Sequence, residues 1–138
     1  MTTASRPTIP AERYRDRIAA ARDLAAEAGL AAILVGTGAD MAYLAGYPAS
    51  SLERLTMLVI PAVGDWALVA PRLEATPAHA CPAAAGGFLP VVAWDEGSDA
   101  HAVVAGMVRV HKRHRFLARR KSAQLTYKIG SADAHFFL

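Results

Sequence analysis

Hydrophobic positions along the chain recur with two spacings, which predict one long helix followed by several short strands. Between residues 11 and 28, apolar side chains recur at helical spacing, and charged residues fill many of the positions between them. We expect this helix to start at Pro10, because the missing N–H of proline needs no partner in a first turn, and to stop at Gly29. The apolar positions behind this prediction are Tyr14, Ile18, Ala21, Leu24, Ala25 and Ala28.

Short apolar runs after this helix predict strands. Residues 31–36 are apolar throughout, which is typical of a strand covered on both faces. Residues 55–60 and 66–70 form two further runs with a short turn between them, so we expect an antiparallel hairpin. A fourth strand is expected at residues 89–94.

The segments between these runs carry weaker helix patterns. Residues 39–44 predict a short helix with Asp40 near its start, where a carboxylate complements the helix dipole. Residues 72–80 predict a helix weakened by Pro77, and residues 82–87 predict a loop.

The region after the fourth predicted strand begins with a helix start signal. Ser98 or Asp99 is expected to cap a helix there, and residues 124–130 have weak strand character. With 138 residues and 54% hydrophobic residues, we expect one domain in which helices pack on a sheet.

Charge divides the chain into two parts. Residues 1–108 carry 7 Lys/Arg and 11 Asp/Glu, a net charge of −4, whereas residues 109–138 carry 8 Lys/Arg and one acidic residue, a net charge of +7. We therefore expect a loose arm at residues 1–10, a folded domain at 11–108 and a basic tail at 109–138. The tail either has a separate role or does not belong to the fold.

Cysteine and hydropathy patterns bound the cellular context. The single cysteine, Cys81, excludes an internal disulfide and a cysteine-cluster metal site, and we interpret it as a small buried hydrophobe. The first 16 residues lack the apolar core of a signal peptide, and the most apolar stretch, residues 55–70, is interrupted by Pro61, Gly64 and Asp65. The cytoplasm is the default expectation, with no membrane partner.

Several possible sites are disfavoured by their own neighbours. His111 and His114 would share a helix face, but the surrounding Lys and Arg residues would repel a metal ion. The basic segment 109–121 could contact phosphates, yet it lacks an aromatic ladder, so a solvated face is favoured over nucleic-acid binding. Ser50 and Ser51 lie outside any Gly-x-Ser-x-Gly elbow.

One stretch stands out as a candidate interaction surface. Tyr43 and Tyr47 flank Gly46, and Arg54 follows just before an apolar run. Tyrosine and arginine in loops beside a rigid sheet are typical of binding surfaces. Tyrosines also cap a core with their hydroxyls at its rim, and the residue types alone leave both interpretations open.

Five motifs follow one another along the chain: EAGLAAILVG, ADMAYLAGY, ERLTMLVIP, GDWALVAPRLE and VVAWDEG. Their order resembles the N-terminal domain of the creatinase/prolidase/aminopeptidase P family. The resemblance runs from about Arg13 to about Val108. The segment Tyr43 to Tyr47 is similar to the family's aromatic-Leu-Thr-Gly-aromatic signature with alanine in place of threonine. Asp40 stands where the family commonly has Asn, and Arg54 matches its arginine before a strand.

This resemblance implies an α/β fold with a mixed sheet flanked by helices. Family members carry a second, C-terminal domain that binds two divalent metals through Asp, Asp, His, Glu and Glu and cleaves Xaa-Pro bonds, or creatine. The chain ends before that domain, and none of its acidic or histidine residues matches those ligands. We therefore expect no cofactor in this chain and no peptidase activity from it alone.

The resemblance also implies an accessory role. In this family the N-terminal domain helps to form the dimer and shapes the substrate entrance, and here Asp40, Tyr43, Tyr47 and Arg54 are the candidate residues. The expected partner is a second copy or a metallopeptidase catalytic domain. The alternative is a free-standing binding module whose basic tail holds an anionic partner such as nucleic acid.

Overall fold

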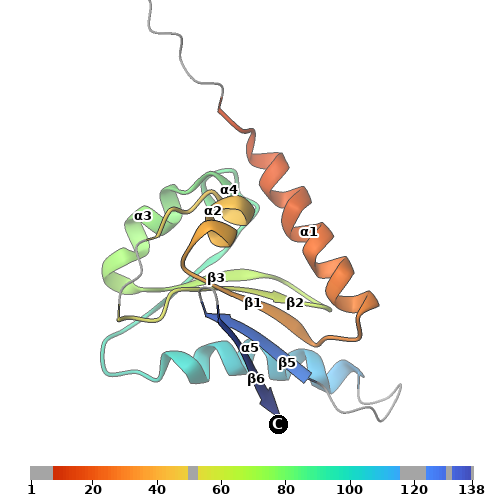
Figure 1. Cartoon of the computed structure of the whole chain (residues 1–138). Helices are drawn as coiled ribbons and strands as arrows, with labels where there is room; N and C mark the ends of the chain where they lie inside the picture. The colour runs from red at the N-terminus through yellow and green to blue at the C-terminus, as the bar shows by residue number, and fades with distance from the viewer. Residues whose placement is uncertain (1–7, 50–52, 116–123, 130–131, 138) are drawn as a thin grey trace, which may run out of the picture.

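The computed structural model describes residues 8–49, 53–115, 124–129 and 132–137, with side chains described for 8–49 and 53–108 (Figure 1). The helices alternate with the strands along most of the chain, as the hydrophobic pattern predicts. The strands are β1 Ala32–Gly36, β2 Met57–Pro61, β3 Ala67–Pro71, β4 Val91–Trp94, β5 Gln124–Ile129 and β6 Ala132–Phe137. The helices are α1 Ala11–Glu27, α2 Ala39–Ala45, α3 Ala75–Ala80, α4 Pro82–Ala85 and α5 Ala100–Arg115, with a 3₁₀ turn, η1, at Arg72–Glu74.

The strands form one mixed sheet in the order β4-β3-β2-β1-β5-β6. β2 pairs antiparallel with both β1 and β3, which confirms the predicted hairpin, while β3–β4 and β1–β5 are parallel. Helices α1 to α4 cover one face and α5 covers the other (Figure 1). The fold is therefore α/β, with a mixed sheet flanked by helices, as the resemblance implies.

Alternate residues of the central strands feed two separate cores. In β2, Leu58 and Ile60 pack with α1 to α4, whereas Met57 and Val59 pack against α5. Every residue of β2 and β3 is buried. Because side chains alternate between the two faces of a strand, these continuous apolar runs require a helix layer on each side.

Fewer of the apolar side chains of helix α1 are buried than its sequence predicts. Tyr14, Ile18 and Ala25 are buried, but Leu24 is 64% exposed. The chain leaves the helix through Gly29, which has a φ of 73° as expected. The backbone N–H of Leu30 donates to the carbonyl of Ala25 at 2.9 Å, a bond typical of a helix that ends in this way.

The predicted loop at residues 82–87 is wrong in part, because it contains α4. Pro82 occupies the first turn of that helix, where its missing N–H has no intrahelical partner to lose. The predicted helix at 72–80 is divided into η1 and α3, and Pro77 fits within the first turn of α3. In both places a proline favours the start of a short helix instead of preventing it.

Helix α5 begins with the cap that the sequence predicts. The Asp99 carboxylate accepts a hydrogen bond from the backbone N–H of Ala102 at 3.0 Å.

Beyond Val108 only backbone is described, so the side chains of His111 and His114 lie outside the described part. The basic residues 119–121 lie outside it altogether, and a separate tail from residue 109 stays a prediction. Among the described helices, none combines the length and apolar character needed to cross a membrane.

Gly46 ends α2 at a crowded turn of the helix layer. Its φ is 71°, a left-handed conformation that suits glycine. A Cβ built on Gly46 would lie 2.8 Å from ring carbons of Pro82 and 3.0 Å from Cζ of Tyr14. Gly29 has a similar φ of 73°, but a Cβ there would meet nothing within 4 Å. Substitution of these two glycines therefore distinguishes the cost of a left-handed backbone, which applies at both, from the cost of steric crowding, which applies only at Gly46.

We expect Gly46→Ala to destabilise the protein more than Gly29→Ala. Gly29→Ala should lower the free energy of unfolding by about 1–2 kcal/mol, the cost of a left-handed alanine. Gly46→Ala adds overpacking against Pro82 and Tyr14, for a total of about 2–5 kcal/mol. Urea unfolding of the two variants measures the difference. Equal losses would show that the contact with Pro82 does not constrain this turn.

Candidate functional site

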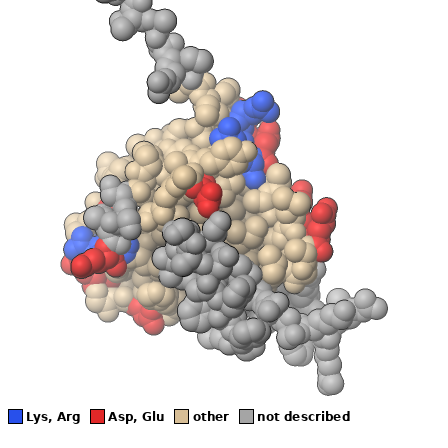
Figure 2. All heavy atoms as spheres, in the orientation of Figure 1, with Lys and Arg blue, Asp and Glu red and all other residues tan. Residues whose placement is uncertain are grey.

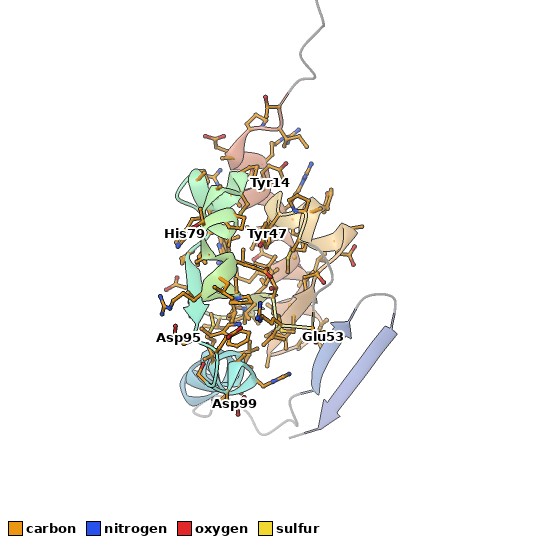
Figure 3. All side chains as sticks on the ribbon, turned by 90° about the vertical axis from the view of Figure 1, so that its left-hand side faces the viewer. Tyr14, Tyr47, Glu53, His79, Asp95 and Asp99 are labelled. Carbon is orange, nitrogen blue, oxygen red and sulfur yellow. The ribbon has the colours of Figure 1, made fainter. Side chains whose placement is uncertain are left out.

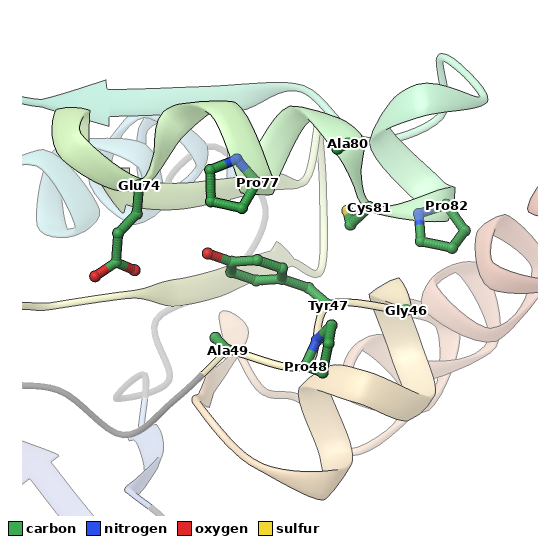
Figure 4. Close-up of a pocket in the computed structure, with 9 residues that line it drawn as sticks. All are labelled: Gly46, Tyr47, Pro48, Ala49, Glu74, Pro77, Ala80, Cys81 and Pro82. Atoms are coloured by element: carbon green, nitrogen blue, oxygen red, sulfur yellow. The ribbon is translucent and has the colours of Figure 1, made fainter.

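The two tyrosines of the candidate stretch point into different environments. Tyr43 lies on α2 and is 58% exposed, whereas Tyr47 follows the turn at Gly46 and is 6% exposed. The left-handed turn reverses the chain after α2 and directs Tyr47 toward α3 (Figure 4). Leu44, between them, is half-buried and packs against the core of the helix layer. The stretch therefore presents one tyrosine outward and one inward.

Tyr43 is held in place by an arginine of α1. The Arg17 guanidinium carbon lies 4.1 Å from the centre of the Tyr43 ring, and its Nη1 donates to the Tyr43 carbonyl at 2.7 Å. The same guanidinium lies 5.2 Å from the centre of the Tyr14 ring. A cation over an aromatic face is attracted by the ring's electrons, and a cation also suits the carbonyl end of a helix. Arg17 thus fixes an exposed aromatic surface on α2.

Tyr47 forms part of the wall of an open hollow between the end of α2 and α3 (Figure 4). The hollow has a volume of about 530 Å³, within the range of small-ligand sites. Its wall is mainly apolar, and its ionisable groups are the Tyr47 phenol, the Glu74 carboxylate and the Cys81 thiol. The lining residues are Gly46, Tyr47, Pro48, Ala49, Glu74, Pro77, Ala80, Cys81 and Pro82.

Burial controls the ionisation of two of these groups. Burial raises the pKa of the Tyr47 phenol, and the negative charge of the adjacent Glu74 carboxylate raises it further. Burial also raises the pKa of the Cys81 thiol. A thiol that stays protonated is a poor nucleophile, so Cys81 serves as a buried apolar group, as its sequence context indicates.

Arg54 belongs to a different region of the molecule. Its guanidinium forms an ion pair with Glu96, just after β4, and Arg72 forms a two-pronged pair with Asp95, in which Nη2 and Oδ2 are 3.0 Å apart. The Arg72 guanidinium lowers the pKa of Asp95. Figure 3 shows Asp95 well below Tyr47 in the view, toward α5. The structure therefore brings Tyr43 and Tyr47 onto one helix layer but places Arg54 away from them.

Asp40 and the surrounding surface complete the region. Asp40 is exposed in the first turn of α2, as the sequence predicts. Figure 2 shows one face of the molecule, on which the described side chains are mostly uncharged, with charged groups gathered near its edges and one acidic group near its middle. Such a face is suited to contact with another protein surface.

The described side chains do not form a metal centre. Among them, no group of three or more His, Cys, Asp or Glu residues lies close enough together to hold an ion. The aromatic, apolar and carboxylate groups of this region are suited to binding.

Glu74 is the site residue that sequence reasoning missed. It lies 27 positions after Tyr47 in the sequence, and the two meet only because α3 packs beside the end of α2 (Figure 4). The local signal was present, since Glu74 lies three positions after the end of the buried strand β3 and ends the motif GDWALVAPRLE. Spacing in the sequence, however, does not reveal which strand end lies beside which helix.

Comparison with known protein families identifies the same family that the order of the sequence motifs indicates. The family profile described as creatinase/prolidase N-terminal domain matches residues 17–117. Probable dipeptidases PepE of Mycobacterium bovis and Mycobacterium tuberculosis are 42% identical over 98 residues, which cover 71% of this chain and 26% of each relative. The chain thus spans about a quarter of the length of these relatives.

Solved structures share the same architecture. The dipeptidase PepE from Mycobacterium ulcerans aligns with a TM-score of 0.69 and 36% identity, covering 75% of this chain and 28% of that one. The N-terminal domain of a Xaa-Pro dipeptidase from Lactobacillus brevis aligns with a TM-score of 0.60 and 21% identity, covering 71% of this chain and 69% of that one. The second likeness concerns the fold alone.

The raised pKa of Tyr47 predicts a loss of stability at high pH. A group whose pKa is higher in the folded state stabilises that state fully below its unfolded pKa of about 10 and loses this contribution as the pH rises through the folded value. The Cys81→Ala background removes the other group whose pKa is raised by burial. In that background, Tyr47→Phe should make the free energy of unfolding fall less steeply above about pH 10. Urea unfolding between neutral and alkaline pH tests this. The same slope with and without the hydroxyl would contradict it.

Proposed function

Because this chain belongs to the creatinase/prolidase N-terminal domain family, we propose that it acts as the non-catalytic N-terminal module of a dipeptidase of the Xaa-Pro peptidase type. The observation that carries this proposal is the match of residues 17–117 to the family profile. The 42% identity to probable dipeptidases PepE, over 26% of their length, supports it. The chemistry of hydrolysis would come from a separate catalytic domain with two divalent metals.

The role within such an enzyme is to pack against a second protein surface and to shape the way in for the substrate. The exposed ring of Tyr43 supports this role, because Arg17 holds it in a fixed position on α2 before any partner arrives. A rigid, exposed aromatic side chain is a common energetic centre of protein interfaces. Asp40 lies on the same short helix, so both would face the same partner.

We expect the purified chain to leave Xaa-Pro dipeptides intact, with or without added Mn²⁺, Co²⁺ or Zn²⁺. The described residues provide no metal-binding group of three or more ligands, and hydrolysis of this kind needs a metal-bound water as nucleophile. Amino-acid release is measured over the time in which a mycobacterial PepE consumes its substrate. Metal-dependent release of an amino acid that stops when the metal is chelated would refute the proposal.

We expect the chain to associate with the remainder of a mycobacterial PepE from which the matching segment has been removed. Association is measured by sedimentation and by recovery of dipeptide hydrolysis. Tyr43→Ala should weaken it about tenfold, the effect of losing roughly 1.4 kcal/mol at an interface. Val63→Ala is a matched control, because Val63 is a 45% exposed apolar residue at the turn between β2 and β3. No association of the unmodified chain, or equal effects of both variants, would refute the role.

A further inference from the structure

The hollow beside Tyr47 contains the carboxylate of Glu74, which forms no ion pair with any cationic side chain that the structure describes. Four acidic residues elsewhere pair with arginines, namely Asp16, Asp23, Asp95 and Glu96. Glu74 is less exposed than these four, yet no Lys, Arg or His side chain within residues 8–49 and 53–108 forms an ion pair with it. Its described polar neighbour is the Tyr47 phenol. A partly buried carboxylate of this kind is electrostatically complementary to a cation from outside.

The walls of the hollow favour a flat cation with an apolar stem. Pro48, Pro77 and Pro82 line the hollow together with the Tyr47 ring. Figure 4 shows the Tyr47 ring lying between Pro77 on α3 and Pro48 and Ala49 after α2, with its hydroxyl toward Glu74. Proline rings and a buried phenol have little conformational freedom, so the hollow is formed before anything enters it.

Among protein cations, arginine fits these walls better than lysine. Its guanidinium is planar and weakly hydrated, stacks on flat rings and binds a carboxylate with two parallel hydrogen bonds. Its methylene stem lies favourably along apolar surface. The Tyr47 hydroxyl points toward Glu74, and the carboxylate keeps lone pairs that can accept from a second donor.

We propose that this hollow is a socket for an arginine side chain of the catalytic domain against which the module packs. The inference rests on the proposed function and names the chemistry of one contact in that interface. The length of the relatives supports a protein partner, because the match covers only 26% of the dipeptidases that this chain resembles and the remainder offers chain against which such a module can pack. The volume of about 530 Å³ admits the arginine together with part of its flanking backbone.

A pair of small probes tests the socket without the catalytic domain. N-acetyl-arginine amide should produce saturable shifts in the backbone amide signals of Gly46, Tyr47, Ala80 and Cys81 in the full chain. N-acetyl-citrulline amide has nearly the same shape without the charge, and it should bind about tenfold more weakly. Equal shifts with the two probes, or arginine shifts spread over the whole surface, would overturn the inference.

Two variants test whether the Glu74 carboxylate is the group that binds the arginine probe. Glu74→Gln should weaken binding of the arginine probe about tenfold, while Glu27→Gln, which removes an exposed charge at the end of α1, should leave it unchanged. Circular dichroism and urea unfolding confirm that both variants fold. If both substitutions weaken binding equally, the effect is one of net charge and the socket is wrong.

Association with the catalytic part of PepE separates this inference from the proposed function. Glu74→Gln should weaken that association about tenfold, and Glu27→Gln should not. If the chain associates but Glu74→Gln has no effect, the socket is refuted and the proposed function stands. If the unmodified chain does not associate, the proposed function fails and so does the identity of the partner, whatever the arginine probe does at the hollow.

Discussion

Burial of both faces of β2 and β3 is the constraint on which the rest of the structure depends. Every residue of these two strands is buried, so neither face of the central sheet can be left to solvent. Helices α1 to α4 cover one face, and α5 covers the other through Val104 and Val108. The hydrophobic effect stabilises both layers together, since removal of either would expose alternate residues of the same strands. The hollow lies in the helix layer on one face, between the end of α2 and α3.

The turn at Gly46 connects this packing to the candidate site. It lets the chain pass within contact of Pro82 and Tyr14 and then enter the layer with Tyr47. Tyr14 belongs to α1 and Pro82 to α4, so one glycine lies where three helices meet. A site formed at such a junction is rigid, because its walls are also the contacts that hold the helices together.

Much of the fold could be predicted from the hydrophobic pattern, and much less of the site. The runs at residues 31–36, 55–60 and 66–70 identified strands because continuous apolar runs of this length fit little else between turn residues. The helix at Pro82 was missed because a short alanine-rich segment has no periodicity to detect. Tyr43 and Tyr47 were found as a pair, but their opposite exposure depends on packing beyond the turn. Arg54 and Glu74 could not be placed, because their neighbours come from distant segments.

The charged pairs around β4 have a consequence for how this domain meets other chains. β4 forms one edge of the sheet, and Arg72 and Arg54 pair with the two acidic residues that directly follow it. The strand has only four residues and comes directly after Pro90, which has no N–H to offer. Short edge strands bounded by proline and charge resist the addition of a foreign strand. At this edge, recognition has to proceed through side chains, so specificity is set by their chemistry instead of by backbone pairing that any extended peptide could imitate.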